Sequence, residues 1–340
     1  MQDCTVAANS FRDTPLGRRI VTVPIVFLGA LILIPGSIVI LPLAALFDVI
    51  RGRVRLPTVR VLLFGLVYLG WEVVAVSSAL ALWVASGFGL LLGRRWFVQA
   101  HRQIQVSWAN SLIGTMRRFL RLDLVIEGTD CLTPGPVVVF CRHASIIDTL
   151  LPAHVLSTSG GLDLRYVLKH ELLWDPALDI VGNRIPNHFV DRSGQNTRAE
   201  LDKIGVLASG MDANESFTIF PEGSRYTESK RTRAIEKLRE TDPELAVRAE
   251  RLERTMPPRV GGVLTILAAT PDIDVVIIAH TGLEGLAGVL DLWRVVPFRH
   301  PVQVTMWRVP RADIPADDAG RIDWIYSEWE RVDRWIRDHG

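Results

Sequence analysis

The sequence predicts an α/β domain preceded by a helical membrane region. Long apolar runs lie near the N-terminus, and beyond Leu122 short β-like runs alternate with helical patterns. The net charge also changes near Leu122. Residues 1–122 hold 13 Arg and four acidic residues, a net charge of about +9. The whole chain has a net charge of +1, so the rest carries about −8. Basic residues beside long apolar runs are typical of contact with anionic lipid headgroups. Nucleic-acid binding is disfavoured, because these arginines flank segments of membrane length.

Two apolar runs define a membrane region at residues 1–95. Ile20–Phe47 has 28 residues without a charge, and Val61–Gly93 has 33 with Glu72 as its only charged side chain. Either run exceeds the roughly 20 residues that cross a bilayer as a helix. Prolines, which favour bends, interrupt the first run at Pro24, Pro35 and Pro42.

Arginine clusters flank both runs, at residues 18–19, 51–60 and 94–95. Two simple spans would place the middle cluster on the side of the membrane opposite the other two, which the positive-inside tendency disfavours. We therefore predict bent or re-entrant helical hairpins that enter one leaflet of the cell membrane and keep the clusters and the following domain at its cytoplasmic face. One or two true spans remain the alternative.

The three cysteines do not indicate a disulfide framework or a metal site. Cys4, Cys131 and Cys141 form no CxxC pair, so a reducing, cytoplasmic setting is expected. Cys141 is interpreted as a small buried hydrophobe at a strand end rather than as a nucleophile.

Residues 96–340 are predicted to form the α/β domain. Short β-branched or apolar runs predict its strands, at Leu124–Glu127, Val137–Phe140, Leu164–Lys169, Phe217–Phe220, Val275–Ala279 and Val302–Val309. Apolar residues at helical spacing predict its helices, at Phe97–Leu120, Ile147–Leu156, Asn196–Gly210, Thr227–Thr255 (two helices broken near Asp242), Gly262–Ala269 and Ile322–Arg337.

A first polar cluster follows the predicted strand Val137–Phe140, where it contains His143 and Asp148. A histidine is the natural general base for a hydroxyl group at neutral pH, and a carboxylate can fix its tautomer. Five residues turn an ideal helix too far for both groups to share a face. The pair therefore requires His143 just before a helix and Asp148 in its first turn; the alternative is a polar cluster that only caps the helix.

Two further clusters contain an arginine and follow a predicted strand or precede a predicted helix. Phe189 and Arg192 lie in the first, and the second runs Phe220-Pro-Glu222-Gly223-Ser-Arg225. Glycine permits close backbone approach, and arginine binds phosphate by paired hydrogen bonds. A surface ion pair is the alternative for either arginine alone.

Taken in order, HxxxxD, FxxR and FPEGxR resemble the motifs of the glycerolipid (lysophospholipid) acyltransferase family, over about Leu122–Gly285. Residues 220–262 are most similar to the branch that contains eukaryotic-type 1-acylglycerol-3-phosphate acyltransferases and lysocardiolipin acyltransferases. The chain departs from the family at Arg142, where Asn commonly precedes the histidine. Around His280 it fits the fourth motif of that branch only loosely.

The resemblance implies a central mixed sheet flanked by helices, with a domain core at residues 122–285. It implies that His143 deprotonates the acceptor hydroxyl for direct attack on a thioester, and that Asp148 orients His143. It further implies that the phosphate-bearing acceptor is held, and its pocket shaped, by Arg192, Glu222, Gly223, Arg225 and Phe189. Lys169, at the end of a predicted strand, is our own addition as a phosphate contact; a solvated lysine is its alternative.

The expected reaction moves a fatty acyl group from acyl-CoA or an acyl-carrier protein, as co-substrate, to the sn-2 hydroxyl of lysophosphatidate or a related lysophospholipid. No cofactor or metal is expected. The sequence has no GxSxG elbow, P-loop or GxGxxG, so a serine acyl-enzyme and nucleotide chemistry are not indicated. A CoA-independent transacylase, a lipid hydrolase and a non-catalytic lipid-binding membrane protein remain as alternatives.

Overall fold

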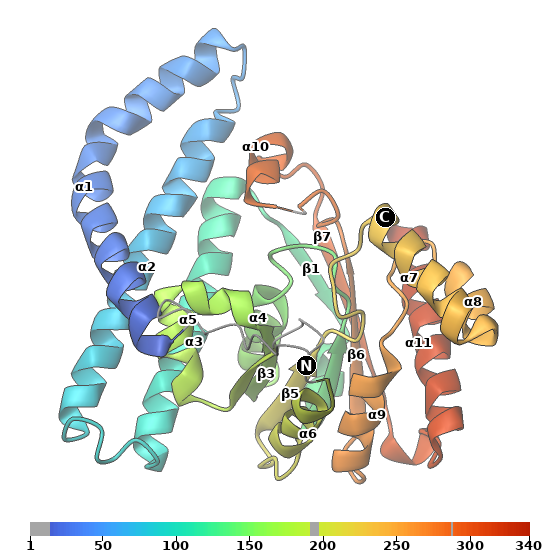
Figure 1. Ribbon diagram of the computed structural model, residues 1–340. Coiled ribbons are helices and arrows are strands. Elements are labelled where there is room, and N and C mark those ends of the chain that lie inside the picture. The colour runs from blue at the N-terminus through green and yellow to red at the C-terminus, as the bar shows by residue number, and fades with distance from the viewer. Residues whose placement is uncertain (1–13, 191–196, 287) are drawn as a thin grey trace, which may run out of the picture.

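A computed structural model describes residues 14–190, 197–286 and 288–340. The chain begins with two long helices, α1 (Pro15–Ile50) and α2 (Pro57–Ala85), both long and apolar enough to cross a membrane by length and composition alone. They pack against each other as an antiparallel hairpin at one side of the molecule (Figure 1). The hairpin turns at residues 51–56, which include Arg51, Arg53 and Arg55 of the middle arginine cluster, whereas Arg60 lies in the first turn of α2.

Each apolar run forms one continuous helix, whereas the sequence predicted that the chain reverses within the runs as re-entrant hairpins. α1 continues through Pro24, Pro35 and Pro42 and is curved (Figure 1). Each proline removes one helical hydrogen bond and bends the helix, whereas a full reversal would expose many more backbone polar groups within an apolar segment. The chain therefore reverses between the runs.

Helix α2 is fixed to the rest of the protein along most of its length. Near its start, Arg60 Nη1 donates to the carbonyl of Phe119 at 2.6 Å. Near its middle, Glu72 accepts from Trp108 Nε1 and from the backbone N–H of Ala177, both at 3.1 Å. Near its end, Arg184 Nη1 donates to the carbonyl of Ala79 at 2.7 Å. Helix α2 is thus a wall of the α/β domain.

The α/β domain contains a seven-stranded sheet in the order β1-β7-β6-β2-β5-β3-β4. Neighbouring strands are parallel except β6 and β7, so the sheet is mixed, as expected. The strands are β1 (Leu124–Glu127), β2 (Val137–Cys141), β3 (Asp163–Lys169), β4 (Asn187–Val190), β5 (Glu215–Ile219), β6 (Val275–Thr281) and β7 (Val302–Val309). All residues of the central strands β2, β5 and β6 are buried, which matches the short apolar runs of β2 and β6.

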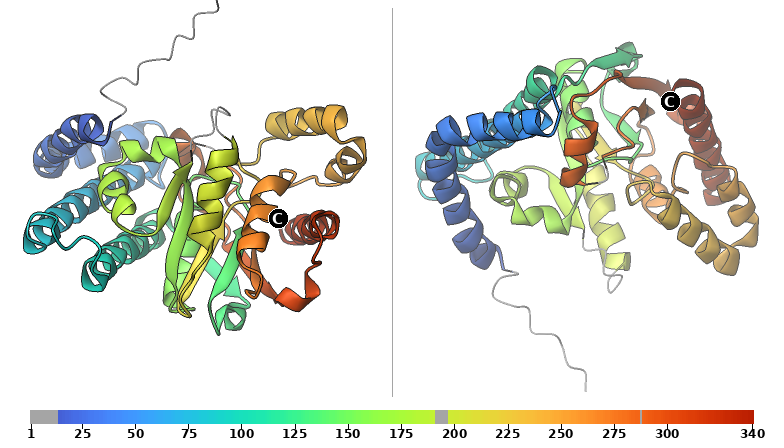
Figure 2. Two further views of the ribbon diagram at one scale, coloured as in Figure 1. Left: turned by 60° about the horizontal axis from the view of Figure 1, so that its bottom comes forward. Right: turned by 90° about the horizontal axis from the view of Figure 1, so that it is seen from above.

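Helices cover both faces of the sheet (Figure 2). The helices of the domain are α3 (Arg95–Thr115, continued by a π-helical turn to Leu120), α4 (Leu150–Thr158), α5 (Pro176–Ile180), α6 (Thr197–Ala208), α7 (Glu228–Thr241), α8 (Pro243–Glu250), α9 (Val260–Ala269), α10 (Leu292–Val295) and α11 (Asp318–His339). Short 3₁₀ turns lie at 129–132, 170–174, 182–184, 289–291 and 311–313.

The sheet separates two apolar cores. On one face, Val137 and Val139 of β2 join residues of α3 and α4. On the other, Val138 and Phe140 join residues of α6, α9 and α11. Alternate residues of a strand point to opposite faces, so one short run serves both cores. Strand β4 was not predicted, because Asn187 and His188 interrupt its apolar pattern at the edge of the sheet.

Candidate active site

The sequence-predicted polar clusters follow β2 and β5, which are parallel neighbours. The carboxyl ends of parallel strands meet at one edge of a sheet, which brings His143 after β2 close to Phe220 after β5. Their rings lie 4.6 Å apart between centroids. Residues 142–149, here called the dyad loop, connect β2 to α4.

His143 and Asp148 form a hydrogen-bonded dyad. His143 Nδ1 lies 3.1 Å from Asp148 Oδ2, and the imidazole is 13% exposed. The same carboxylate accepts from the backbone N–H groups of Ala144 and Ser145, and its Oδ1 accepts from Ser145 Oγ at 2.8 Å. Because Nδ1 faces a carboxylate, it carries the proton of the neutral ring, and Nε2 is left as the basic nitrogen.

The placement of Asp148 corrects one expectation. Helix α4 begins at Leu150, so Asp148 precedes the helix. The dyad loop instead closes around the carboxylate, because the N–H groups of residues 144 and 145 point at it. The two side chains meet through this loop and not through a shared helix face.

Burial alone would raise the pKa of Asp148, but its surroundings lower it. The imidazoles of His280 and His143 and the N–H of Ser145 favour the carboxylate form and outweigh desolvation. Asp148 therefore stays ionised while His143 gains a proton, as an orienting carboxylate must.

Glu222 lies beneath the dyad loop. Its Oε1 accepts from the backbone N–H of His143 at 3.0 Å, and its Oε2 accepts from the N–H of Met256 at 3.1 Å. The side chain is buried, and burial raises its pKa to about 8 although Arg142 opposes the shift. Both oxygens accept from the protein backbone, so Glu222 supports the dyad loop, and its implied contact with the acceptor phosphate stays a prediction.

Gly223 is required by the turn that follows β5. Its φ of +66° is in the left-handed region, and a Cβ there would lie 2.6 Å from Cδ and Nε of Arg259. The backbone N–H of Arg259 also donates to the carbonyl of Pro221 at 2.8 Å. The glycine thus allows an arginine from a distant loop to lie against the motif.

Cationic side chains gather beyond the ends of β3 and β5. Burial, then the charges of Arg225 and Lys169, lower the pKa of Lys230, so the three cations lie close enough to repel one another. Lys230 Nζ also donates to the carbonyl of Arg225 at 3.4 Å, and Lys169 lies 3.3 Å from Glu171. Lys230 belongs to this group, although it was not among the site residues predicted from the sequence.

The other predicted residues lie apart from the dyad or cannot be placed. The ring of Phe189 fills the space beside Gly182, where a Cβ would lie 2.9 Å from it. Arg192 lies outside the described residues. Cys141 is fully buried, and burial raises the pKa of its thiol well above the usual value, which confirms its interpretation as a buried hydrophobe.

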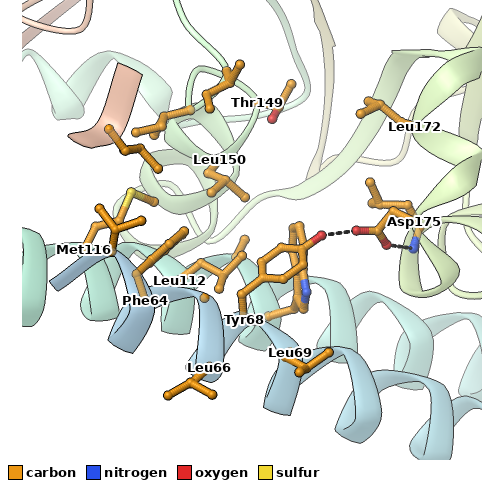
Figure 3. A pocket seen from close by; sticks show the side chains of 18 of the residues that line it. Phe64, Leu66, Tyr68, Leu69, Leu112, Met116, Thr149, Leu150, Leu172 and Asp175 are labelled. Carbon is orange, nitrogen blue, oxygen red and sulfur yellow. Dashed lines mark hydrogen bonds between the residues drawn. The ribbon is translucent and has the colours of Figure 1, made fainter. Parts of the chain in front are cut away.

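An apolar cavity of about 780 Å³ adjoins the dyad loop (Figure 3). Its walls come from α1, α2, α3 and α4, and Ile146, Ile147 and Thr149 of the dyad loop line it as well. Tyr68 and Asp175 form a polar contact at this wall, where the hydroxyl donates to the carboxylate (Figure 3). The apolar faces of these helices are evident in the sequence, but the cavity is not, because a cavity depends on how the helices pack.

No group of three or more His, Cys, Asp or Glu residues that could hold a metal ion occurs in the part of the chain that the structure describes. A histidine–carboxylate dyad at a sheet edge, beside an apolar cavity and a group of cations, is typical of an enzyme that acts on an amphiphilic, anionic substrate.

Comparison with known proteins agrees with this class. Residues 123–280 match the model of the family described as Acyltransferase. No curated protein matches the chain. A crystal structure of the 1-acyl-sn-glycerophosphate (LPA) acyltransferase PlsC from Thermotoga maritima matches 78% of this chain and 96% of its own, at 14% identity and a TM-score of 0.47. Those two values are too low to transfer that protein's substrate to this chain.

Residues 123–280 of the α/β domain therefore match the Acyltransferase family, the class of enzyme that the motifs predicted.

Proposed function

We propose that the protein transfers a fatty acyl group from acyl-CoA, or from an acyl-carrier protein, to the sn-2 hydroxyl of lysophosphatidate or a related lysophospholipid. One observation carries this proposal: the His143–Asp148 dyad shares its loop with the wall of an apolar cavity of about 780 Å³. The acyl chain is assigned to this cavity, with its carboxyl end toward the dyad loop.

The chemistry follows from the dyad. Nε2 of His143 takes the proton of the acceptor hydroxyl as the oxygen attacks the thioester carbonyl. The tetrahedral intermediate collapses with cleavage of the carbon–sulfur bond, and the leaving thiolate takes the proton from the imidazolium. Asp148 stabilises that imidazolium through Nδ1. No acyl-enzyme forms in this scheme.

The acceptor phosphate is assigned to the cations at the same edge of the sheet. Arg225 and Lys169, whose charges both act on Lys230, support this assignment, and Arg192 is proposed to join them. Phe189 is proposed to shape the acceptor pocket. Arginine is suited to phosphate because its planar donors match two phosphate oxygens.

We further propose that the hairpin enters one leaflet at the cytoplasmic face and does not cross the membrane. Helix α2 is hydrogen-bonded to the α/β domain from Arg60 to Ala79, so a transmembrane α2 would draw that domain into the bilayer. Most large apolar side chains of α1 are exposed. Exposed apolar faces of this length suit insertion among acyl chains.

The activity is tested with purified protein in nanodiscs, radiolabelled acyl-CoA and a panel of lysophospholipids, with His143→Ala beside wild type. We expect label in one phospholipid product with wild type and a loss of transfer in the variant. Free fatty acid without an acceptor would favour a hydrolase instead. No transfer from acyl-CoA, acyl-carrier protein or phospholipid donors would overturn the proposal.

The topology is tested separately by introducing single cysteines at residues 51–60 and labelling them in intact cells. We expect these positions to react only after the membrane is permeabilised. Labelling by an impermeant reagent from outside would show that the hairpin crosses the bilayer.

A further inference from the structure

Arg142, where the chain departs from the first family motif, contacts His280, which lies in the segment that fits the fourth motif only loosely. Arg142 Nη1 donates to the carbonyl of His280 at 2.6 Å, and His280 Nε2 lies 3.1 Å from the carbonyl of Arg142. Both side chains are fully buried. The two bonds are reciprocal, since each side chain reaches the backbone of the other residue, and they join the end of β2 to the end of β6.

The surroundings of His280 fix its tautomer. Nε2 faces two acceptors, the carbonyl of Arg142 at 3.1 Å and Asp148 Oδ1 at 3.5 Å, so it carries the proton. Within the described residues, the buried Nδ1 has no hydrogen-bond partner, and burial lowers the pKa of His280 although Asp148 opposes the shift. The ring is therefore a neutral N–H donor at the carboxylate of the dyad.

Asp148 thus lies between two imidazoles that have different tasks. His143 contacts Oδ2 and is partly exposed, whereas His280 faces Oδ1 from inside the domain. A donor at Oδ1 stabilises the ionised carboxylate and limits its rotation. His280 therefore helps to fix the direction in which Oδ2 of Asp148 faces His143.

The guanidinium of Arg142 extends this support. Its Nη1 pairs with Glu284 at 2.5 Å, and its Nη2 donates to the carbonyl of Arg254 at 2.9 Å. Glu284 accepts in turn from Thr281 Oγ1 and from the N–H of Gly282. Arg142, which directly precedes His143, is therefore bonded to two loops that are distant in the sequence.

We propose that His280 and Arg142 are positioning residues for the acyl transfer, which hold Asp148 and the backbone of His143 in the geometry that the base requires. This inference rests on the proposed function, because it concerns how the dyad is held during that reaction. Neither residue touches a substrate in this assignment; both act through Asp148 and His143.

The test compares His280→Gln, whose amide N–H lies near the place of Nε2–H, with His280→Phe, which keeps the bulk and loses the donor. For His280→Phe we expect kcat to fall about ten- to hundredfold with KM for the acceptor little changed, because the variant loses the N–H that bonds to the carbonyl of Arg142 and faces Asp148 at 3.5 Å. His280→Gln should recover most of the loss.

The pH profile separates positioning from a general loss of stability. Without the donor at Oδ1, Asp148 is a stronger acceptor for the Nδ1–H of His143 and favours the imidazolium. The acid limb of kcat/KM, where the base must be neutral, should therefore move to higher pH in His280→Phe, by about one unit or less. Charged groups around His280 that bear on this limb are Arg142, Asp148 and Glu284.

His101→Phe is the matched control, because His101 is also fully buried but contacts the carbonyl of Phe97 and Arg184 in the helical region. It should lower the melting temperature without moving the acid limb. Unchanged kcat and pH profile in His280→Phe, or a loss that only parallels its melting temperature as in His101→Phe, would overturn the proposal. Inactive wild-type protein would instead count against the proposed function.

Discussion

The dyad loop and the N-terminal hairpin both line the apolar cavity, yet they are held in place in opposite ways. The dyad loop is fixed by buried polar contacts, in which Asp148 alone accepts from two backbone N–H groups and a serine hydroxyl and faces two imidazoles. Helix α1 leaves most of its large apolar side chains exposed and contacts the α/β domain through Arg18 and Arg19 at Asp179. Precise chemistry is thus supported by satisfied polar groups, and lipid contact by apolar surface.

The comparison predicts that a small polar change at the dyad costs more activity than any change in the hairpin. In Asp148→Asn, the amide can no longer stabilise the imidazolium or hold the correct tautomer of His143. We expect kcat to fall about 10³- to 10⁴-fold, as is typical when this carboxylate role is removed. Single-turnover kinetics should show the loss in the chemical step, with acyl-CoA affinity nearly unchanged. A loss of less than tenfold would mean that Asp148 does not orient the base.

The next effect concerns the attachment of the hairpin. Asp179 is buried and contacts Arg18 at 3.0 Å and Arg19 at 2.7 Å, so Asp179→Ala removes the carboxylate that both cations share. We expect a loss of about 3 kcal/mol in stability, because breaking a buried ion pair leaves an uncompensated charge. Thermal unfolding in detergent measures it, with Asp318→Ala at an exposed pair as control. Equal melting temperatures for the two variants would contradict a fixed attachment.

A smaller, selective effect is expected at the cavity wall in α2. Gly65 lines the cavity, and a Cβ at this position meets nothing within 4 Å. Gly65→Leu should therefore place its side chain in the cavity and shift the preference toward shorter acyl chains. We expect kcat/KM for the longest accepted acyl-CoA to fall about tenfold relative to a shorter one, since a few methylene groups in an apolar pocket have effects of this size.

Gly65→Ala is the control for this change, because it improves helix propensity by about 1 kcal/mol and adds only a methyl group. It should raise the melting temperature and leave the chain-length profile close to that of wild type. If Gly65→Leu and wild type accept the same chain lengths with the same kcat/KM ratio, the cavity does not hold the acyl chain.

The two regions also differ in how far the sequence predicted them. The dyad was predictable because His143 and Asp148 lie five residues apart after an apolar strand, and the central strands were predictable because β2 and β6 are short apolar runs. The contact of Asp148 with His280 joins residues far apart in the chain and depends on the pairing of β2 with β6. The backbone contacts of Glu222 were not predictable either, since a motif shows that a carboxylate is present but not that two backbone N–H groups bond to it.

The sequence also did not predict which parts of the hairpin contact protein, because α1 and α2 have similar apolar sequences and different surroundings. The smallest expected effect tests this difference. Leu31 of α1 is 71% exposed, so Leu31→Gln should leave the fold and the cavity intact and weaken only the contact with lipid. Removing one inserted apolar side chain costs about 1.5 kcal/mol, which predicts roughly tenfold weaker partitioning into vesicles.

Flotation with anionic phosphatidylglycerol vesicles measures that partitioning, and kcat on substrates dispersed in detergent should stay within about twofold of wild type. Leu112→Gln is the contrasting variant, because Leu112 of α3 is buried at the cavity wall. It should lower stability and activity in detergent, since a buried amide without a partner is costly, and leave the lipid-facing surface unchanged. If Leu31→Gln behaves like Leu112→Gln, α1 is packed against protein and the single-leaflet proposal fails.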